Sequence, residues 1–376
     1  MKGRLVVVKV GTGSLTKRDG SLDLQVMRKV VDQIAEALKR GYRIILVTSG
    51  AVASGMAELG VRPNPNDIVF KQACAATGQS ILMSYYRELF GHHGVKIAQI
   101  LLTKEDLSDR VSYIHTCNVL DRLLQLDVVP IVNENDVTSI DELIPVTKGY
   151  KVNFSDNDIL SVLIANAVQA DLVLILSHVG GLYTENPEDP KARLIQVVDK
   201  VTSEIKQSAE GKSRLGRGGM KTKVEAALIA AQSGIPLIIA GSRRKNVILD
   251  VLDGKPVGTY FKPSERMPGA KRWIAYGASI KGQIHVNDGA KKAVLNGASL
   301  LAVGITDVTA QFKMGEVVSL VDENGKEFGR GIANYTSEEI NSIKGLKTSQ
   351  IARILGYIGQ KEIVNRKRMH ITEAEA

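Results

Sequence analysis

Runs rich in Val, Ile and Leu alternate with segments of helical periodicity through most of this 376-residue chain. The first run is residues 4–10, and residues 22–38 then carry apolar side chains at helical spacing. Because parallel strands need long crossovers, usually helices, the alternation predicts an α/β fold: a three-layer sandwich with a mainly parallel sheet. Further strands are expected at residues 42–47, 95–102, 128–132, 171–176 and 235–240, and further helices at residues 67–90, 112–126, 159–168 and 220–233.

The pattern of apolar residues changes near residues 263–271. From there, short apolar pieces are separated by many glycines, and the dipeptide Asn324-Gly325 is a strong hairpin signal. We therefore expect two domains: a larger one at residues 1–262 and a small β-rich one at residues 271–365.

Composition excludes several classes of protein. No apolar run approaches about 18 residues, so no membrane span is expected, and the N-terminus lacks the features of a signal peptide. The two cysteines, Cys74 and Cys117, have no CxxC spacing, which favours a reduced, cytoplasmic protein. The six histidines show no metal-ligand spacing. A net charge of +9 fits nucleic acid, an anionic substrate or simply a basic surface, although 5% aromatics would give few platforms for bases.

Two polar clusters follow apolar segments in the middle of the chain. Residues 133–136, Asn-Glu-Asn-Asp, end the expected strand at 128–132, and residues 156–158, Asp-Asn-Asp, precede an apolar helix. In open α/β sheets ligands bind at the carboxyl ends of strands. Around one crevice, these clusters would suit a substrate with a positive amine or a phosphate-bound Mg²⁺. Taken singly, each is equally well explained as a polar turn or a helix cap.

Glycines and lysines offer phosphate chemistry without a standard phosphate loop. Lys206 stands where a Walker A loop ending at Gly211-Lys212-Ser213 needs glycine, and Thr16 occupies the last glycine position of a dinucleotide motif. Three other stretches remain. Lys9 lies in a buried-looking strand and needs an anion, unless it snorkels from an edge strand. Ser49-Gly50 opens a helix with free amides. Residues 215–223 are a glycine-rich stretch at a helix start, or a flexible interdomain loop.

The ordered set of these motifs is much more specific than any one of them. A strand with Lys-x-Gly-x-Gly-Ser, then Thr-Ser-Gly-Ala, Asn-Glu-Asn-Asp, Asp-Asn-Asp and Gly-x-Gly-Gly-Met-x-Thr-Lys occur in this order. The chain resembles the amino acid kinase family, in a form that carries a C-terminal PUA domain. The resemblance covers nearly the whole chain, with the kinase-like part to about residue 260 and the PUA-like part from Lys271.

The resemblance implies an activity and its partners. Family members of this form use ATP and Mg²⁺ to phosphorylate the side-chain carboxylate of L-glutamate, giving L-glutamyl 5-phosphate in the first step of proline biosynthesis. A homo-oligomer, dimer or tetramer, is expected, as is functional association with a reductase that takes the acyl phosphate. No membrane partner is expected, and RNA is not expected as the main ligand.

Residue roles carry over from the family motifs one by one. Lys9 matches the lysine on the ATP phosphates, and Asp158 matches the aspartate that orients the catalytic lysines. Lys223 matches the lysine at the transferring phosphate. The remaining matches are the glutamate-binding positions Ser49, Gly50, Asn133, Asp136, Asp156 and Asn157, and the nucleotide loop Arg217, Gly218, Gly219, Met220, Lys221, Thr222 and Lys223. No protein side chain is assigned to the metal, which would be held by the ATP phosphates.

The chain departs from the family pattern on the nucleotide side. Ser177-His178 stands where Thr-Asp is usual, and Arg217 stands where Thr is usual. Both places are still expected to contact ATP. The stretch at residues 139–154 is longer than the family's substrate loop, which bears on the response to inhibitors.

Two alternatives stay open. The chain could be another amino acid kinase, acting on N-acetylglutamate, carbamate, aspartate or UMP. Asp136 argues partly against the first two, because an acetylated amine or a carbamate has no ammonium group to pair. It could also be an RNA-binding protein that acts through its PUA-like domain.

Overall fold

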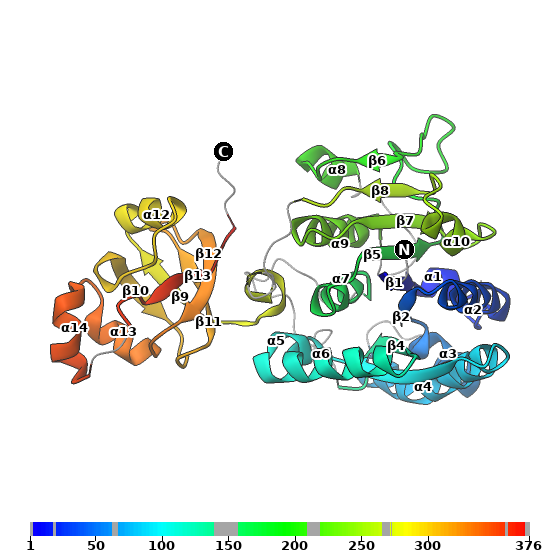
Figure 1. Cartoon of the computed structure of the whole chain (residues 1–376), viewed down its shortest axis with the longest axis horizontal. Helices are drawn as coiled ribbons and strands as arrows, with labels where there is room; N and C mark the ends of the chain where they lie inside the picture. The colour runs from blue at the N-terminus through cyan, green and yellow to red at the C-terminus, as the bar shows by residue number, and fades with distance from the viewer. Residues whose placement is uncertain are drawn as a thin grey trace. The chain divides into compact units, whose positions relative to one another are not determined.

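The computed structural model describes residues 3–17, 20–61, 67–138, 157–208, 219–264, 271, 273–357 and 360–372. The chain divides into two compact units (Figure 1). The first comprises Met1–Leu107 with Val111–Arg266, and the second Ser108–Arg110 with Met267–Ala376.

The first unit is built on an eight-stranded sheet with the order β3-β4-β2-β1-β5-β7-β8-β6. Every neighbouring pair is parallel except β7 and β8. The mainly parallel sheet expected from the sequence is therefore confirmed. The strands are β1 (Leu5–Val10), β2 (Arg43–Val47), β3 (Lys96–Leu102), β4 (Val128–Glu134), β5 (Leu172–Ser177), β6 (Val197–Val198), β7 (Leu237–Gly241) and β8 (Thr259–Phe261).

Helices cover both faces of this sheet and complete the three layers. Asp23 caps α2 by accepting from the amides of Gln25 and Val26, and Asp67 caps α4 through the amide of Phe70. The helices are α1 (Thr12–Leu15), α2 (Leu24–Lys39), α3 (Ala51–Leu59), α4 (Ile68–Gly91), α5 (Lys104–Ser108), α6 (Arg110–Gln125), α7 (Asn157–Ala167), α8 (Ser203–Ser208), α9 (Met220–Gln232) and α10 (Val247–Leu252).

The alternation of side chains along β1 decides what reaches each face. Val6, Val8 and Val10 belong to the apolar core that α2, α4 and α10 complete on one face. Successive side chains of a strand point to opposite faces, so Val7 and Lys9 point to the other face, against which α7 and α9 pack. The side chain of Lys9 therefore lies on the face of the sheet that α7 and α9 cover.

Helices α3 and α4 approach each other at backbone distance. A Cβ atom on Gly78 would lie 1.9 Å from the carbonyl oxygen of Ala51, and one on Gly55 would lie 1.8 Å from that of Cys74. Any larger residue at either position would force the helices apart. The crossing therefore holds the middle of α4 against the start of α3.

The second unit contains a five-stranded sheet with the order β10-β9-β11-β12-β13. Only the pair β9 and β11 is parallel. Asn324-Gly325 makes the turn between β11 and β12, with Gly325 at φ 74°, so the predicted hairpin is confirmed. The elements are β9 (Ile280–Val286), β10 (Ile305–Thr309), β11 (Val317–Val321), β12 (Glu327–Ala333), β13 (Val364–Ile371), α12 (Asp288–Leu295), α13 (Ser337–Ile343), α14 (Thr348–Leu355), a π-helical turn at Trp273–Gly277 and a 3₁₀ turn at Ala302–Gly304.

The second unit contains more helix, and extends further along the chain, than the β-rich domain expected at residues 271–365. Of the helices that the structure describes in this unit, α12, α13 and α14 pack on the sheet, and their apolar residues share its core with Phe328 and Tyr335. The last strand, β13, continues past residue 365 to Ile371. Across the described parts of both units, none of the helices is long and apolar enough to span a membrane.

Candidate active site

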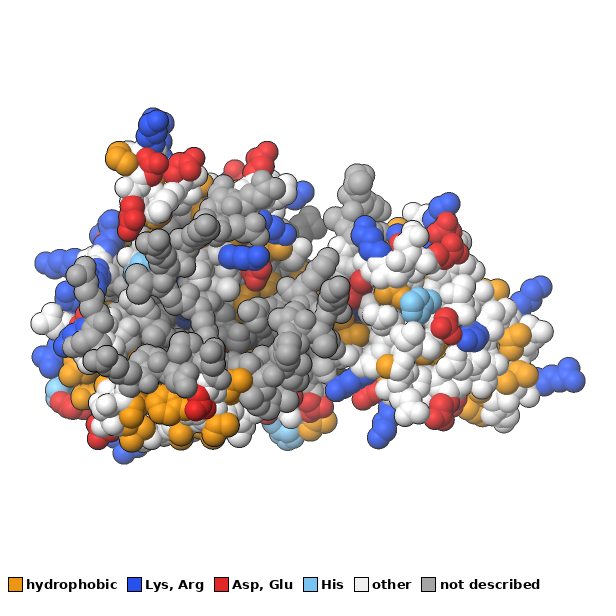
Figure 2. All heavy atoms as spheres, turned by 180° about the vertical axis from the view of Figure 1, so that it is seen from behind, with side chains coloured by type: hydrophobic (Ala, Val, Ile, Leu, Met, Phe, Trp, Pro, Cys, Tyr) orange, Lys and Arg blue, Asp and Glu red, His pale blue; other side chains and the backbone are white. Residues whose placement is uncertain are grey.

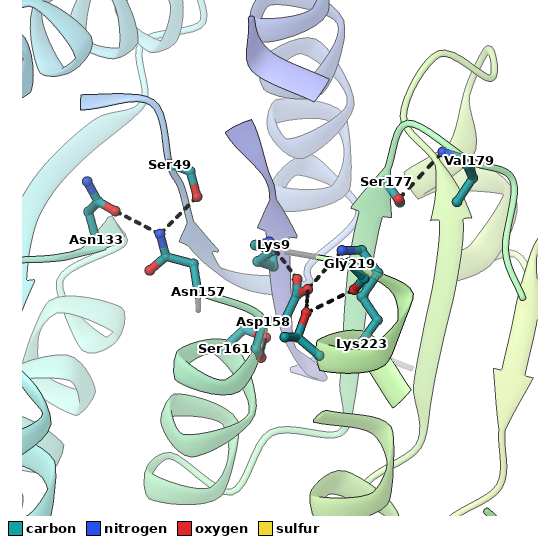
Figure 3. Close-up of polar contacts among 11 residues, drawn as sticks. Lys9, Ser49, Asn133, Asn157, Asp158, Ser161, Ser177, Val179, Gly219 and Lys223 are labelled. Atoms are coloured by element: carbon teal, nitrogen blue, oxygen red, sulfur yellow. Dashed lines mark hydrogen bonds and ion pairs between the residues drawn. The ribbon is translucent and has the colours of Figure 1, made fainter. Parts of the chain in front are cut away.

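Three charged residues from three elements meet at the carboxyl end of β1 (Figure 3). Asp158, in the first turn of α7, lies between the ammonium groups of Lys9 from β1 and Lys223 from α9. Lys9 Nζ is 2.5 Å from Asp158 Oδ1, and Lys223 Nζ is 2.9 Å from Asp158 Oδ2. The exposed fractions are 0% for Asp158, 3% for Lys9 and 5% for Lys223. One buried carboxylate therefore bridges two buried ammonium groups.

The electrostatics of this bridge favour the arrival of an anion. Burial by itself would raise the pKa of Asp158, but the charges of Lys9 and Lys223 outweigh burial and hold that pKa below its ordinary value. Asp158 is therefore ionised, and its single negative charge is shared between two positive partners. Buried cations are costly unless their charge is balanced, so the bridge is suited to receive a further anion.

The start of α9 adds donors beside the two lysines. Gly219 caps the helix without a side-chain hydrogen bond, and no acidic residue lies in the first turn. Thr222 Oγ1 donates to the carbonyl of Gly219 at 2.9 Å and lies 3.3 Å from Asp158 Oδ2. The amides and the helix dipole at such a terminus favour an anion. Backbone amides and Lys223 thus come from the same turn.

A chain of polar side chains lies on the other side of Asp158. Asn157 Nδ2 donates to Ser49 Oγ at 2.8 Å and to Asn133 Oδ1 at 3.1 Å, as Figure 3 shows. Asn133 Nδ2 donates in turn to Gln79 Oε1 at 2.9 Å. Gly50, with φ 105°, follows Ser49 and caps α3 without a side-chain hydrogen bond. The segments around residues 49, 133 and 157 therefore share one site.

Ser177 is the last residue of β5 and His178 follows it, near the same edge of the sheet. Ser177 is buried, and its Oγ accepts a long hydrogen bond, 3.5 Å, from the amide of Val179. A Cβ atom on Gly13 would lie 3.6 Å from His178 Nδ1, so α1 lies close to the residue that follows β5. Burial lowers the pKa of His178, and the charges of Lys223 and Arg243 lower it further. The cationic groups at this end of the sheet therefore disfavour the protonated form of His178.

The structure brings together most of the residues that the motifs singled out. Lys9, Asp158 and Lys223 form one group, and Ser49, Asn133 and Asn157 form another. Asp136 lies half-buried in the turn after β4, Met220 is half-buried and Lys221 is exposed. Asp156, Arg217, Gly218 and the stretch 139–154 lie outside the described residues. Their expected roles stay predictions.

Gln79 is the site residue that the motifs missed. It comes from the middle of α4, 54 positions before its partner Asn133 in the sequence. Its neighbours, Gly78 and Ser80, are small, so the stretch has the composition of an ordinary helix contact. No sequence signal distinguishes it.

The fold and the site define an α/β enzyme that handles phosphate, and comparison with known proteins gives the family. The model of the amino acid kinase family matches residues 4–241, and that of the PUA domain matches residues 282–355. The chain belongs to the amino acid kinase family.

Curated relatives align with nearly the whole chain. Glutamate 5-kinase from Dehalococcoides mccartyi is 44% identical over 368 residues, covering 97% of each chain. Glutamate 5-kinase from Thermoanaerobacter sp. is 41% identical over 372 residues, covering 98% of each. Among solved structures, carbamate kinase from Giardia lamblia bound to AMP-PNP is 20% identical, with a TM-score of 0.49, over 70% of this chain and 99% of that one.

Proposed function

We propose that this protein transfers the γ-phosphoryl group of ATP to the side-chain carboxylate of L-glutamate. The product is L-glutamyl 5-phosphate, and the step is the first of proline biosynthesis. The observation that carries the proposal is the pair of buried lysines on Asp158, beside a second site that offers polar groups for an amino acid. The full-length similarity to glutamate 5-kinases supports the choice of substrate.

The chemistry asks for charge stabilisation more than for proton transfer. A carboxylate is already ionised at neutral pH, so its attack on phosphorus needs no general base. The obstacle is the repulsion between an anionic nucleophile and an anionic phosphate. Phosphoryl transfer then depends on positioning and on stabilising charge. Lys9 and Lys223, held by Asp158, supply two fixed positive charges for this purpose.

Nucleotide binding falls to the ends of β1 and β5 and to the start of α9. Lys9, Lys223 and the amides after Gly219 fit the phosphates, and Ser177 and His178 border them. Among the described residues no group of three His, Cys, Asp or Glu could hold a metal. In this proposal Mg²⁺ is held by the ATP phosphates, as the resemblance to the family implies, and it would supply further neutralisation of their charge.

Glutamate binding falls to the ends of β2 and β4 and the start of α7. Asp136 would pair the substrate ammonium, and Ser49 with the free amides at the start of α3 would bind the α-carboxylate. Asn133 and Asn157 join these two regions by hydrogen bonds. The γ-carboxylate would then extend toward Lys9 and Lys223.

A hydroxylamine trap tests the proposal directly, because it converts an acyl phosphate to a stable hydroxamate. The purified protein with ATP and Mg²⁺ is expected to form hydroxamate from L-glutamate and not from N-acetylglutamate or aspartate. Carbamate and UMP are followed in parallel by ADP release. If the protein turns over one of these other acceptors and not glutamate, the family assignment stands and the proposed substrate is wrong.

RNA binding is the second candidate, and only the net charge of +9 and the PUA match favour it. Filter binding of tRNA to the whole protein at several salt concentrations separates it from the kinase proposal. Specific binding with a steep salt dependence would support a second function. The kinase proposal expects weak binding that is lost by physiological salt.

We further propose that the protein is cytoplasmic and that its unstable product passes to a glutamyl phosphate reductase. We also propose that it forms a homo-oligomer, a dimer or a tetramer. Hydrophobic side chains gather along the lower edge of the first unit (Figure 2). Helices α4 and α6 expose Val69 by 71%, Val111 by 62% and Val119 by 48%. Apolar side chains of this kind favour self-association. Sedimentation of a single species with the mass of one chain would exclude it.

A further inference from the structure

The polar chain that ends at Gln79 has a direction. A carboxamide donates from its nitrogen and accepts at its oxygen. Gln79 accepts from Asn133 at 2.9 Å, Asn133 accepts from Asn157 at 3.1 Å, and the same Asn157 nitrogen also donates to Ser49 Oγ at 2.8 Å. The orientations of the three amides therefore depend on one another. If the Gln79 amide were turned over, both asparagines would have to turn with it.

Two side-chain atoms in this series of hydrogen-bonded amides have no hydrogen-bond partner among the described residues. They are Gln79 Nε2 at one end and Asn157 Oδ1 at the other. Gln79 is 9% exposed and Asn133 2%. A buried polar atom without a hydrogen bond is rare and destabilising. A bound ligand would satisfy Asn157 Oδ1, because the hydrogen bond from Asn157 to Ser49 places this end at the proposed glutamate site.

The backbone holds Gln79 in place. Gly78, the preceding residue, packs α4 against the carbonyl of Ala51 at the start of α3. The position of the Gln79 side chain relative to Ser49 and Gly50 is therefore set by the helix crossing.

We propose that Gln79 is a positioning and specificity-determining residue for the amino acid acceptor, an inference that depends on the proposed glutamate site. By accepting from Asn133, Gln79 favours the orientation in which Asn157 presents a carbonyl oxygen as its free end. A carbonyl oxygen accepts from an ammonium group, which has three N–H donors, better than from an N-acylated amine, which has one. The reversed chain would present an N–H donor instead. Gln79 thus favours a free α-amino acid over its N-acylated form.

Substitutions at Gln79 test this with the hydroxamate assay. Gln79→Met keeps the shape of the side chain and removes its hydrogen bonds. We expect the KM for L-glutamate to rise about 10-fold, the ATP KM to stay within about twofold, and the preference for L-glutamate over N-acetylglutamate to fall. Gln79→Glu keeps the acceptor toward Asn133, so it should retain that preference. If Gln79→Met does not fold, Gln79→Asn, which is too short to reach Asn133, should raise the glutamate KM instead.

Gln33→Met is the matched control. Gln33 is also a buried glutamine, 8% exposed, but it joins α2 to α10 by donating to the carbonyl of Lys29 and accepting from the amide of Ile248. Its loss should lower thermal stability and leave the glutamate KM within about twofold of wild type.

If the wild-type enzyme is active and the glutamate KM of Gln79→Met is unchanged, the inference is overturned and the proposed function stands. Equal rises of the glutamate KM in Gln79→Met and Gln33→Met would also overturn the inference, because the effect of Gln79→Met would then be a general loss of structure. A wild-type protein inactive on glutamate would instead overturn the proposed function.

Discussion

Replacing Asp158 by asparagine should remove the negative charge that bridges two buried ammonium groups. Asp158 is fully buried, and Lys9 and Lys223 are at least 95% buried. Removing one partner from a buried ion pair costs about 3–5 kcal/mol of folding free energy. For a unit of this size that corresponds to a Tm lower by roughly 10 °C. The introduced amide oxygen still accepts a hydrogen bond from one lysine, so we expect the lower end of the range.

Differential scanning calorimetry of Asp158→Asn with and without ATP separates the electrostatic cause from loss of packing. Phosphate oxygens would replace the missing negative charge, so ATP should raise the Tm of the variant more than that of wild type. Asp171→Asn is the control, because Asp171 accepts from the amide of Leu5 at the opposite end of β1. An unchanged Tm in Asp158→Asn, or equal ATP shifts in both proteins, would refute the view that this site is built to balance positive charge with a bound anion.

Three further predictions concern the same site. Lys223→Ala should lower kcat by about 10²-fold or more, the range for a lost transition-state contact; near-normal turnover in the coupled ADP assay would remove Lys223 from the mechanism. Asp136→Ala should mainly raise the glutamate KM, and a raised ATP KM with an unchanged glutamate KM would reverse the assignment of the two sites. The folded pKa of Asp158 lies below its ordinary value of 3.8, so its carboxylate stabilises the fold above that pH and loses this effect as pH falls through the folded pKa. The stability difference between wild type and Asp158→Asn, measured by urea denaturation, should therefore be largest at neutral pH and shrink in acid; a difference that stays constant far into the acid range would contradict this.

The first unit was largely predictable because its strands are buried on both faces. Residues 5–10, apart from Lys9, and residues 172–176 are apolar, as the centre of a parallel sheet requires, and they pair as β1 and β5. The helices between them show clear periodicity. The second unit was less predictable, because its elements are short. The apolar residues 300–303, for example, contribute to a 3₁₀ turn and to an isolated bridge from Leu300 to Val364, and they form no named strand.

Within the site, the sequence indicated which residues are unusual but not which residues they contact. A lysine in a buried strand needs an anion, and Lys9 has one, but its protein partner is the carboxylate of Asp158 from a distant helix. Spacing along the chain carries no information about such a contact, because it depends on the packing of α7 and α9 on the sheet. Gln79 was missed for the same reason. Its role depends on the crossing of α3 and α4, which only the structure shows.

Formation of γ-glutamyl hydroxamate by the purified protein tests the central claim most directly. With ATP, Mg²⁺ and hydroxylamine, the account predicts hydroxamate from L-glutamate at a rate that falls about 10²-fold or more in Lys223→Ala. No hydroxamate from glutamate under conditions where the protein is folded and binds ATP would contradict it.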